Sequence, residues 1–467
     1  MPFGSVEPWA YSALELSIAA VAFLWLYRLY LFPSNPVVWS PLYLPAVVFL
    51  ALMGMQLVPM PREALKLLSP KTAAFYDQTV PGYAQPSRAI AVKEASLAGE
   101  PSPQGAPRLP ISQTPYATRT YLLKGIAFTL FLFLVLNSFR GPGQVRWLLY
   151  AFVLSGAFQA FYGLIEYLSG HQHIFAYQKK YYTDAATGTL INRNHFAGFL
   201  EMTLLVALGL LFSRLREPHR HSAWRERLLS LTDRQASLNL ALLLCIGIVI
   251  IALVLSYSRT GIILGLSAAG AFSLTQLRRQ WSFTRTVLVA MLALIVLVPA
   301  YGVGYWTLTG RYAILTQEFS NPGGRLTVWE DSLRIFRDFP LLGTGAGTFQ
   351  YVFPRYRDVT VTAFYDYAHN DYVQTLGEMG AAGGLILGWG LFAAGQLWVR
   401  RQRENQAIGI LRLAIGFGLL AVALHETVDF GLQIPSNLLA LTSLVGSLSL
   451  VSFADESSPA SMELDHA

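Results

Sequence analysis

The sequence predicts an all-α polytopic integral membrane protein with about 11–12 transmembrane helices. Of its 467 residues, 54% are hydrophobic and only 13% are charged, whereas soluble globular proteins have about 25% charged residues. The mean hydropathy is +0.43. The apolar residues also cluster in blocks of about 18–25 residues, the length that a helix needs to cross about 30 Å of hydrocarbon.

The apolar blocks predict about eleven spanning segments. They cover residues 9–31, 37–59, 120–138, 146–169, 194–213, 237–257, 260–277, 285–306, 372–398, 407–427 and 435–453. The same pattern leaves room for a twelfth segment that is re-entrant or split. Because the first block lacks a basic n-region and a small-residue cleavage site, we expect a retained helix rather than a signal peptide.

Basic residues in the short loops predict the orientation of the chain. Fourteen arginines follow the third, fifth, seventh and ninth segments, at positions 140, 146, 214, 216, 220, 225, 227, 234, 278, 279, 285, 400, 401 and 403. The short loops on the other side hold Lys179, Lys180, Arg193 and Arg259. By the positive-inside rule the arginine-rich side is cytoplasmic, so the N-terminus lies outside. This bias accounts for the net charge of +7 without nucleic acid as a partner.

The loops divide the chain into six parts. Residues 1–59 hold the N-terminal transmembrane helices, 60–119 form an extracytoplasmic loop, and 120–306 form a transmembrane core. Residues 307–371 form a partly helical periplasmic loop, 372–453 the C-terminal transmembrane helices, and 454–467 a cytoplasmic tail. The 60–119 loop is rich in Pro, Ser and Gly, which predicts partial disorder and no chemistry.

An amphipathic stretch at 326–337 lies in the second long loop. The apolar residues Leu326, Trp329, Leu333 and Phe336 recur at helical spacing, opposite Glu330, Asp331, Arg334 and Arg337. We expect a helix that lies on the membrane surface or caps a cavity.

Four polar motifs fall on the predicted outer face. They are Asn192-Arg193-Asn194-His195, Tyr257-Ser258-Arg259-Thr260-Gly261, Gly323-Gly324-Arg325 and Tyr367-Ala368-His369-Asn370-Asp371. Arg193 and Arg259 could be interfacial residues that snorkel to lipid headgroups, but arginines at membrane level on a sparsely charged side more often bind something specific. Arg325 follows two glycines and either begins a surface helix or has a functional role. His195 is interpreted as a structural hydrogen-bonding residue.

The helix that follows the fourth motif carries a glycine stripe. Gly377, Gly380, Gly384 and Gly388 recur every three or four residues, which predicts close helix packing. Packing does not account for Glu378 in the same turn, nor for His369 and Asn370 at the aqueous end. His369 is therefore interpreted as the catalytic histidine.

Three other kinds of site are disfavoured. Gly343-Thr344-Gly345-Ala346-Gly347 has no preceding strand and no following lysine, so it is predicted to be a turn rather than a nucleotide loop. The single cysteine, Cys245, sits in an apolar block, and no His/Cys/carboxylate cluster has metal-ligand spacing. Divalent-ion binding at Glu330-Asp331 or at Asp366 and Asp371 is disfavoured. We expect no metal and no cofactor.

Arginines on the outer face fit a diphosphate, because guanidinium groups bind phosphate oxygens in pairs and stay charged at any working pH. A diphosphate donor in a membrane indicates a polyprenyl diphosphate. Fixed arginines would stabilise the charge that grows on the leaving diphosphate without a metal. Histidine, with an ordinary pKa of about 6.5, suits a general base for an acceptor hydroxyl.

The motifs resemble those of a known family. His369-Asn370, nine residues and then Gly380-Ala381-Ala382-Gly383 is similar to the His-[Asn/Ser/Gln]-x9-Gly-x-x-Gly signature of bacterial O-antigen ligases. Asn192-Arg193-Asn194-His195-Phe196-Ala197-Gly198 and Ser258-Arg259-Thr260-Gly261 resemble motifs that these ligases share with O-antigen and exopolysaccharide polymerases. The resemblance covers roughly residues 190–390.

The resemblance implies a metal-independent, inverting, C-type glycosyltransferase-like fold that uses undecaprenyl-diphosphate-linked glycans in the bacterial inner membrane. Arg193 and Arg259 would bind the diphosphate, with Arg325 as a third. His369 would activate or orient the acceptor, supported by Asn370, with Asn194 and His195 beside the arginines and Gly380 and Gly383 shaping the helix. The 60–119 loop and the count of about eleven spans depart from a typical ligase, which has twelve.

Three functions stay open. A ligase would transfer O-antigen to lipid A–core, and a polymerase would extend a glycan on its lipid carrier. A transporter or flippase of a lipid-linked solute would instead show broken helices near the midplane and inverted repeats. The sequence favours an enzyme whose active site faces the periplasm.

Overall fold

The computed structural model describes residues 2–32, 37–81, 83, 107–139, 141–215, 234–279, 286, 289–290, 324–400 and 405–453. Within these ranges the regular secondary structure is helical, apart from one two-stranded antiparallel hairpin. Its strands are β1 (His173–Ile174) and β2 (Tyr177–Gln178). Nine of the described helices are long and apolar enough to cross a membrane. The predicted all-α polytopic fold class is therefore confirmed.

The nine long helices follow the predicted segments closely. They are α1 (Pro8–Leu31), α6 (Pro115–Ser138), α7 (Pro142–Ser169), α8 (Arg193–Arg214), α10 (Arg234–Leu255), α11 (Arg259–Arg279), α16 (Asp371–Val399), α17 (Gln406–His425) and α18 (Pro435–Ser452). The predicted 37–59 segment is a shorter helix, α2 (Tyr43–Gln56). Fourteen residues of helix rise about 21 Å, less than the hydrocarbon thickness. The predicted 285–306 segment lies almost entirely outside the described residues, as do loop positions 216–233 and the tail 454–467.

The chain divides into two compact units. Unit 1 comprises Met1–Pro41, Ala127–Ile314 and Phe392–Ala467, and unit 2 comprises Leu42–Ile126 and Leu315–Leu391. Short elements complete both: η1 (Pro2–Ser5), α3 (Arg62–Leu68), α4 (Pro70–Thr79), α14 (Arg325–Asp338), α15 (Phe349–Val352), η3 (Phe353–Arg355) and η4 (Gly431–Gln433).

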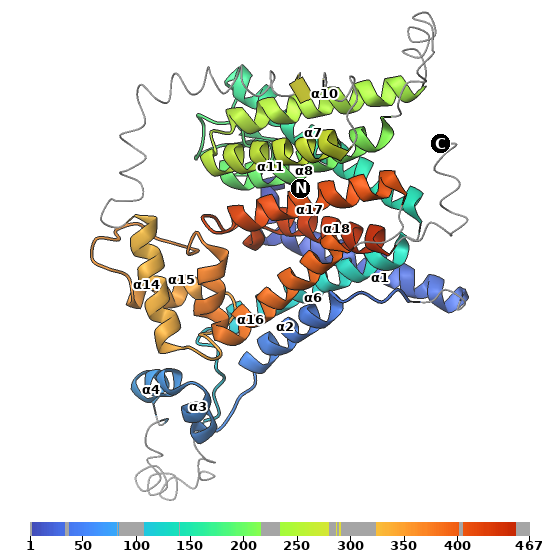
Figure 1. Cartoon of the computed structure of the whole chain (residues 1–467). Helices are drawn as coiled ribbons and strands as arrows, with labels where there is room; N and C mark the ends of the chain where they lie inside the picture. Colours follow the sequence, from blue (N-terminus) through green and yellow to red (C-terminus); the bar gives the residue numbers. More distant parts are fainter. Residues whose placement is uncertain are drawn as a thin grey trace, which may run out of the picture. The chain divides into compact units, whose positions relative to one another are not determined.

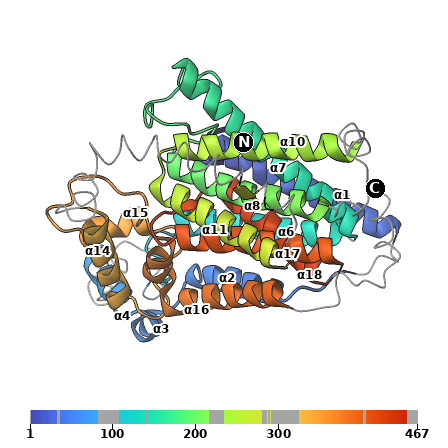
Figure 2. The same ribbon diagram turned by 45° about the horizontal axis from the view of Figure 1, so that its top comes forward.

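Helix α8 is the centre of unit 1. It packs against α7, α10, α11 and α17, which lie around it in Figures 1 and 2. Every residue from His195 to Phe212 is buried. The run is apolar on all sides except at a few polar positions, and such a helix is stable only inside a protein or a membrane. Helix α8 is therefore the buried centre of unit 1, and its neighbouring helices shield it on all sides.

The helices of unit 1 alternate in direction. At one end, the guanidinium group of Arg214 donates hydrogen bonds to Asn239 Oδ1 at 3.1 Å and to the Tyr150 hydroxyl at 3.3 Å, joining the end of α8 to the starts of α10 and α7. At the other end, the hydroxyls of Tyr167 and Tyr257 lie 3.1 Å apart. This up-and-down arrangement agrees with the alternation that the loop arginines predict.

Unit 2 has its own small core. Val328 and Ile335 of α14 pack with Phe349, Phe353 and other buried residues. The predicted helix is present, and Glu330, Arg334 and Arg337 are exposed as expected. Asp331 departs from the expected polar face, because it is buried with Val328, Ser332 and Ile335, while Leu326 is 44% exposed. The acid can be buried because Asp331 Oδ2 accepts a hydrogen bond from the Asp358 N–H at 2.7 Å.

The loop 60–119 contains more structure than its composition predicts. Helices α3 and α4 pack through Leu65, Ala73 and Tyr76, and Tyr83 and Ile111 complete a buried cluster. Arg62 and Asp77 form a two-pronged ion pair at 2.8 Å. Residues 82 and 84–106 lie outside the described part of the chain.

Candidate functional site

The first turns of α8 and α11 pack against each other in unit 1. A Cβ added to Gly261 would lie 2.5 Å from the Ala197 Cβ and 3.1 Å from Glu201 Oε1, so only a glycine permits this approach. Arg193 is the first residue of α8 and Arg259 the first residue of α11. The packing therefore brings together two helix N-termini that both begin with an arginine.

Local sequence explains why α8 begins at Arg193. Asn192 is the N-cap, and its Oδ1 accepts a hydrogen bond from the Asn194 N–H at 2.8 Å. The guanidinium carbon of Arg193 lies 5.4 Å from the centre of the Tyr182 ring, a cation–π contact. The backbone N–H of Asn194 thus takes part in capping the first turn of α8.

The turn before α11 is tight, as predicted. Tyr257 has a φ of 53°, a left-handed conformation that is uncommon for residues other than glycine, and it precedes the buried Ser258. The incoming loop is fixed here too, because the Ala186 N–H donates to the Leu255 carbonyl at 2.9 Å. Lys179 in that loop donates from Nζ to Thr187 Oγ1 at 3.0 Å, and burial lowers the pKa of its ammonium group.

Beneath the first turn of α8 lies a buried polar network that sequence reasoning missed. His425 Nδ1 lies 2.7 Å from Glu201 Oε1, and both side chains are at most 2% exposed. His195 Nε2 lies 3.6 Å from Asp429 Oδ2, and its ring meets Phe430 edge-on at 4.5 Å between centroids. The structural role expected for His195 stays a prediction, and the structure places its ring beside Asp429 and Phe430. An ionisable residue inside an apolar block, such as Glu201, is the signal that could have found this network.

In unit 2, His369 sits in a strained turn before α16. Its φ is 52°, and its ring packs edge-on against Tyr365 at 5.7 Å between centroids. The preceding residue is held on both sides: the Trp329 indole donates to the Ala368 carbonyl at 3.0 Å, and the Ala368 N–H donates to Gln374 Oε1 at 3.1 Å. Strained backbone that is fixed by its neighbours is typical of functional positions.

Asn370 lies in this turn, and Arg325 begins the helix that contacts it. Asn370 caps α16, since its Oδ1 accepts from the N–H groups of Tyr372 and Val373 at 3.1 and 3.0 Å. It thus fixes the backbone beside His369. Arg325 begins α14, and Trp329, one helical turn later, is the residue that binds the Ala368 carbonyl. Gly323 of the same motif lies outside the described residues.

The residues around His369 include groups whose titration is shifted by burial. Partial desolvation raises the pKa of the Asp366 carboxyl above its ordinary value. Burial also raises the pKa of the Tyr367 hydroxyl, which keeps its proton. The turn therefore offers a half-buried imidazole beside a tyrosine hydroxyl that keeps its proton.

Helix α16 is broken at Gly380. This residue has φ 64° and ψ −165°, a conformation essentially restricted to glycine, and an added Cβ would lie 2.4 Å from the Leu341 carbonyl group. The segment 340–345 fills the break: the N–H groups of Ala381 and Ala382 donate to the carbonyls of Pro340 and Leu341 at 2.8 and 3.1 Å. Gly380 shapes the helix by interrupting it, whereas the glycine stripe predicted only packing. A Cβ on Gly383 would lie 2.3 Å from the Met379 Cβ across the same break.

Glu378 has a structural explanation. Its carboxylate accepts hydrogen bonds from the N–H groups of Gly347 and Phe349 at 2.8 and 2.9 Å. The glycine-rich segment Gly343–Gly347 is thus a turn, as predicted, and its amide donors bind a carboxylate of the same unit.

One cavity of about 180 Å³ lies in unit 1, lined by residues such as Gln159, Leu190 and Ser436. None of the predicted site residues lines it.

One family model matches part of the chain. The family model described as O-antigen ligase matches residues 241–388. This match, over about a third of the chain, supports the O-antigen ligase/polymerase superfamily. The matched region of this O-antigen ligase-like protein contains Arg259, Arg325, His369, Asn370 and the Gly380 break, while Arg193, Asn194 and His195 precede it. No curated protein matches the sequence.

The family match confirms the resemblance that the motifs carry. At the level of the family, the match supports an O-antigen ligase-like, glycosyltransferase-type function, and the nine long apolar helices in the described part of the chain indicate a multi-pass membrane protein.

Proposed function

We propose that this protein transfers a glycan from undecaprenyl diphosphate to an acceptor hydroxyl at the periplasmic face of the bacterial inner membrane. The observation that carries the proposal is the pair of packed helix N-termini, each beginning with an arginine. The N-terminal N–H groups and the helix dipoles favour an anion. Arg193 and Arg259 add two permanent positive charges, which suits the two phosphates of the donor.

The reaction follows from these groups. The acceptor oxygen attacks the anomeric carbon of the donor sugar, and the bond from that carbon to the diphosphate oxygen breaks with inversion. The diphosphate leaves with the electron pair, and the arginines stabilise its growing charge, so that no metal is needed. His369 takes the proton of the acceptor hydroxyl, while Asn370 holds the turn in which His369 sits. Arg325 is assigned to the same donor as a third arginine.

The acceptor separates two versions of this function. A ligase transfers the glycan to lipid A–core, and a polymerase transfers it to a second lipid-linked glycan. Both use the same donor chemistry, and the matched family supports either.

A transporter or flippase of a lipid-linked solute is the alternative of another class. It predicts broken helices, and α16 is broken at Gly380. However, the backbone groups freed at this break are bonded by the segment 340–345 of the same unit, and are not left to coordinate a solute. The break therefore supports a fixed loop more than a transport site.

Reconstitution distinguishes the three functions. Purified protein in liposomes receives an undecaprenyl-diphosphate glycan, lipid A–core and a second lipid-linked glycan in equal amounts. Sugar on lipid A–core indicates a ligase, and a lengthened lipid-linked glycan indicates a polymerase. Movement of the donor across the bilayer with no new glycosidic bond would contradict the proposal.

A further inference from the structure

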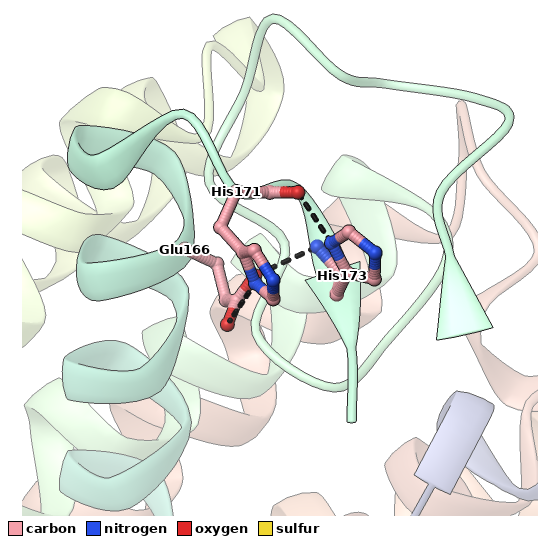
Figure 3. A group of neighbouring side chains, drawn as sticks. All are labelled: Glu166, His171 and His173. Carbon is pink, nitrogen blue, oxygen red and sulfur yellow. Dashed lines mark hydrogen bonds and ion pairs between the residues drawn. The ribbon is translucent and has the colours of Figure 1, made fainter. Parts of the chain in front are cut away.

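Three side chains with metal-ligand atoms meet at the end of α7, in unit 1. One ligand atom from each of Glu166, His171 and His173 lies within 4.8 Å of the other two. Figure 3 shows the carboxylate of Glu166 on the last turns of α7, with the two imidazole rings beside it. The rings stack at 3.8 Å between centroids. None of these residues belongs to the motifs that carry the proposed transfer reaction.

The backbone brings the two histidines to one side. Helix α7 ends at Ser169, and Gly170 and Gln172 both adopt left-handed conformations, with φ of 72° and 52°. In an extended His-x-His sequence the two side chains would also share one side, but at greater separation. Here the turn at Gln172 stacks the rings and folds them back toward the carboxylate of Glu166.

Glu166 is oriented by its surroundings. Its side chain is 11% exposed, and its Oε2 accepts a hydrogen bond from the His173 N–H at 2.7 Å. The same oxygen lies 3.1 Å from His171 Nδ1. Two ligand atoms of a tetrahedral zinc site, with bonds of about 2.0–2.1 Å, are about 3.3 Å apart, so this pair is already spaced for a metal.

We propose that Glu166, His171 and His173 bind a divalent transition metal, for which Zn²⁺ is the probe. Two imidazoles and one carboxylate suit zinc and its neighbours rather than Mg²⁺ or Ca²⁺, which prefer oxygen ligands. His173 must turn its ring to bring a nitrogen closer, and its side chain has room because the residue is only half-buried. Water occupies the fourth position.

The bound metal joins α7 to the hairpin β1–β2. This hairpin opens the connection 170–192, which leads directly to Asn192 and Arg193 at the start of α8. The metal therefore fixes a loop and takes no part in glycan transfer. The proposal is independent of the proposed function, since zinc binding is measured without donor or acceptor.

Zinc content tests the proposal directly. The protein is purified with a tag that contains no histidine, stripped with EDTA, exposed to excess Zn²⁺ and desalted. We expect one zinc per chain by mass spectrometry of the metal, and loss of that zinc in the double variant His171→Ala/His173→Ala. The matched control is His219→Ala/His221→Ala, which removes the other His-x-His pair of the sequence and keeps the zinc. A wild type without zinc, or loss in the control alone or in both variants equally, would overturn the site.

A conservative variant of Glu166 distinguishes metal binding by its carboxylate from the hydrogen bonds that the same group accepts. Glu166→Gln keeps an oxygen that can accept from the His173 N–H, but removes the charge that a metal needs. Because even outer-shell changes at metal sites cost 10–100-fold in affinity, we expect Glu166→Gln to weaken zinc binding by more than about 100-fold in calorimetry. Zinc should also slow hydrogen exchange across 170–178 in the wild type and not in this variant. Unchanged affinity in Glu166→Gln would show that the carboxylate only holds the loop.

Discussion

One buried glutamate from each unit shows two different ways of holding a carboxyl group inside the protein. Glu201 in unit 1 is bound by the imidazole of His425, a residue 224 positions away on another helix. Glu378 in unit 2 is bound by the backbone N–H groups of Gly347 and Phe349. The first contact holds helices together through a titratable pair, and the second fixes a loop. The Glu201–His425 contact thus joins α8 to α17 in unit 1, while Glu378 fixes the Gly343–Gly347 turn in unit 2.

This difference suggests a division of labour. Unit 1 supplies permanent positive charge at the ends of α8 and α11, which suits the donor diphosphate. Unit 2 supplies a group that accepts a proton, which suits the acceptor hydroxyl. Substitutions that remove each part should therefore fail in different ways.

The largest effect is expected from the arginines. Arg193→Ala or Arg259→Ala should lower glycan transfer by roughly 10³-fold or more, because loss of one fixed charge-stabilising group typically costs 10²–10³ and these groups also bind the donor. Transfer is measured in liposomes with purified protein. The control is Arg278→Ala, at the opposite end of α11, which should transfer normally. Wild-type rates in both arginine variants would refute the diphosphate assignment.

His369→Ala should lower turnover by about 10²–10⁴-fold, the usual contribution of a general base. The measurement is single-turnover transfer at saturating donor. His219→Ala, a histidine outside the proposed site, is the control and should leave the rate unchanged. A normal rate for His369→Ala would remove its role as the base.

The Glu201–His425 pair should contribute to stability. His425→Leu leaves a carboxylate buried without its imidazole, which is expected to cost about 3–5 kcal/mol of unfolding free energy. The double variant Glu201→Leu/His425→Leu should recover most of this loss, because the buried charge is then absent. Denaturation in mixed micelles measures both variants. Equal stability of the single and double variants would contradict an ion pair.

A smaller loss is expected at the break in α16. Gly380→Ala places a Cβ against the Leu341 backbone and forces a conformation reserved for glycine, at a cost of about 1–3 kcal/mol. The control is Gly388→Ala in the same helix, where an added Cβ meets nothing within 4 Å. A fall in thermal stability for the first variant alone supports the break, and a continuous helix would make both variants harmless.

The smallest effect is expected on metal removal. If arginines hold the donor, as proposed, transfer should stay within about twofold of its starting rate in excess EDTA. The zinc proposed at Glu166, His171 and His173 lies outside the chemistry, so its loss does not change this expectation. Complete loss of transfer on chelation, restored by Mg²⁺ or Mn²⁺, would require a catalytic metal.

Much of the fold follows from local sequence, and the exceptions have identifiable causes. The long helices are predictable because apolar runs of spanning length have few other stable conformations in a membrane. The buried face of α14 is not predictable from local sequence. Asp331 can be buried because its carboxylate accepts a hydrogen bond from the Asp358 N–H, which is a tertiary contact. The break at Gly380 depends on the segment 340–345 that fills it.

The candidate site also has parts that the sequence predicts and parts that it does not. The motifs around Arg193, Arg259 and His369 are visible in the sequence because arginine and histidine are costly at a membrane face without a function. The Glu166–His171–His173 cluster escapes the sequence because a left-handed residue at Gln172 stacks the two rings. Contacts between helices that are distant in sequence, such as Glu201 with His425, cannot be predicted from local sequence because they depend on how the helices pack.

Donor binding tests the central claim most directly. Affinity for undecaprenyl diphosphate is measured for the wild type, Arg259→Ala and His369→Ala at one ionic strength. If the guanidinium groups hold the leaving group, Arg259→Ala should bind at least about tenfold more weakly, as expected for the loss of a charged hydrogen bond, and His369→Ala should bind like the wild type. Wild-type affinity in Arg259→Ala, or an equal loss in both variants, would contradict the division of labour between the units.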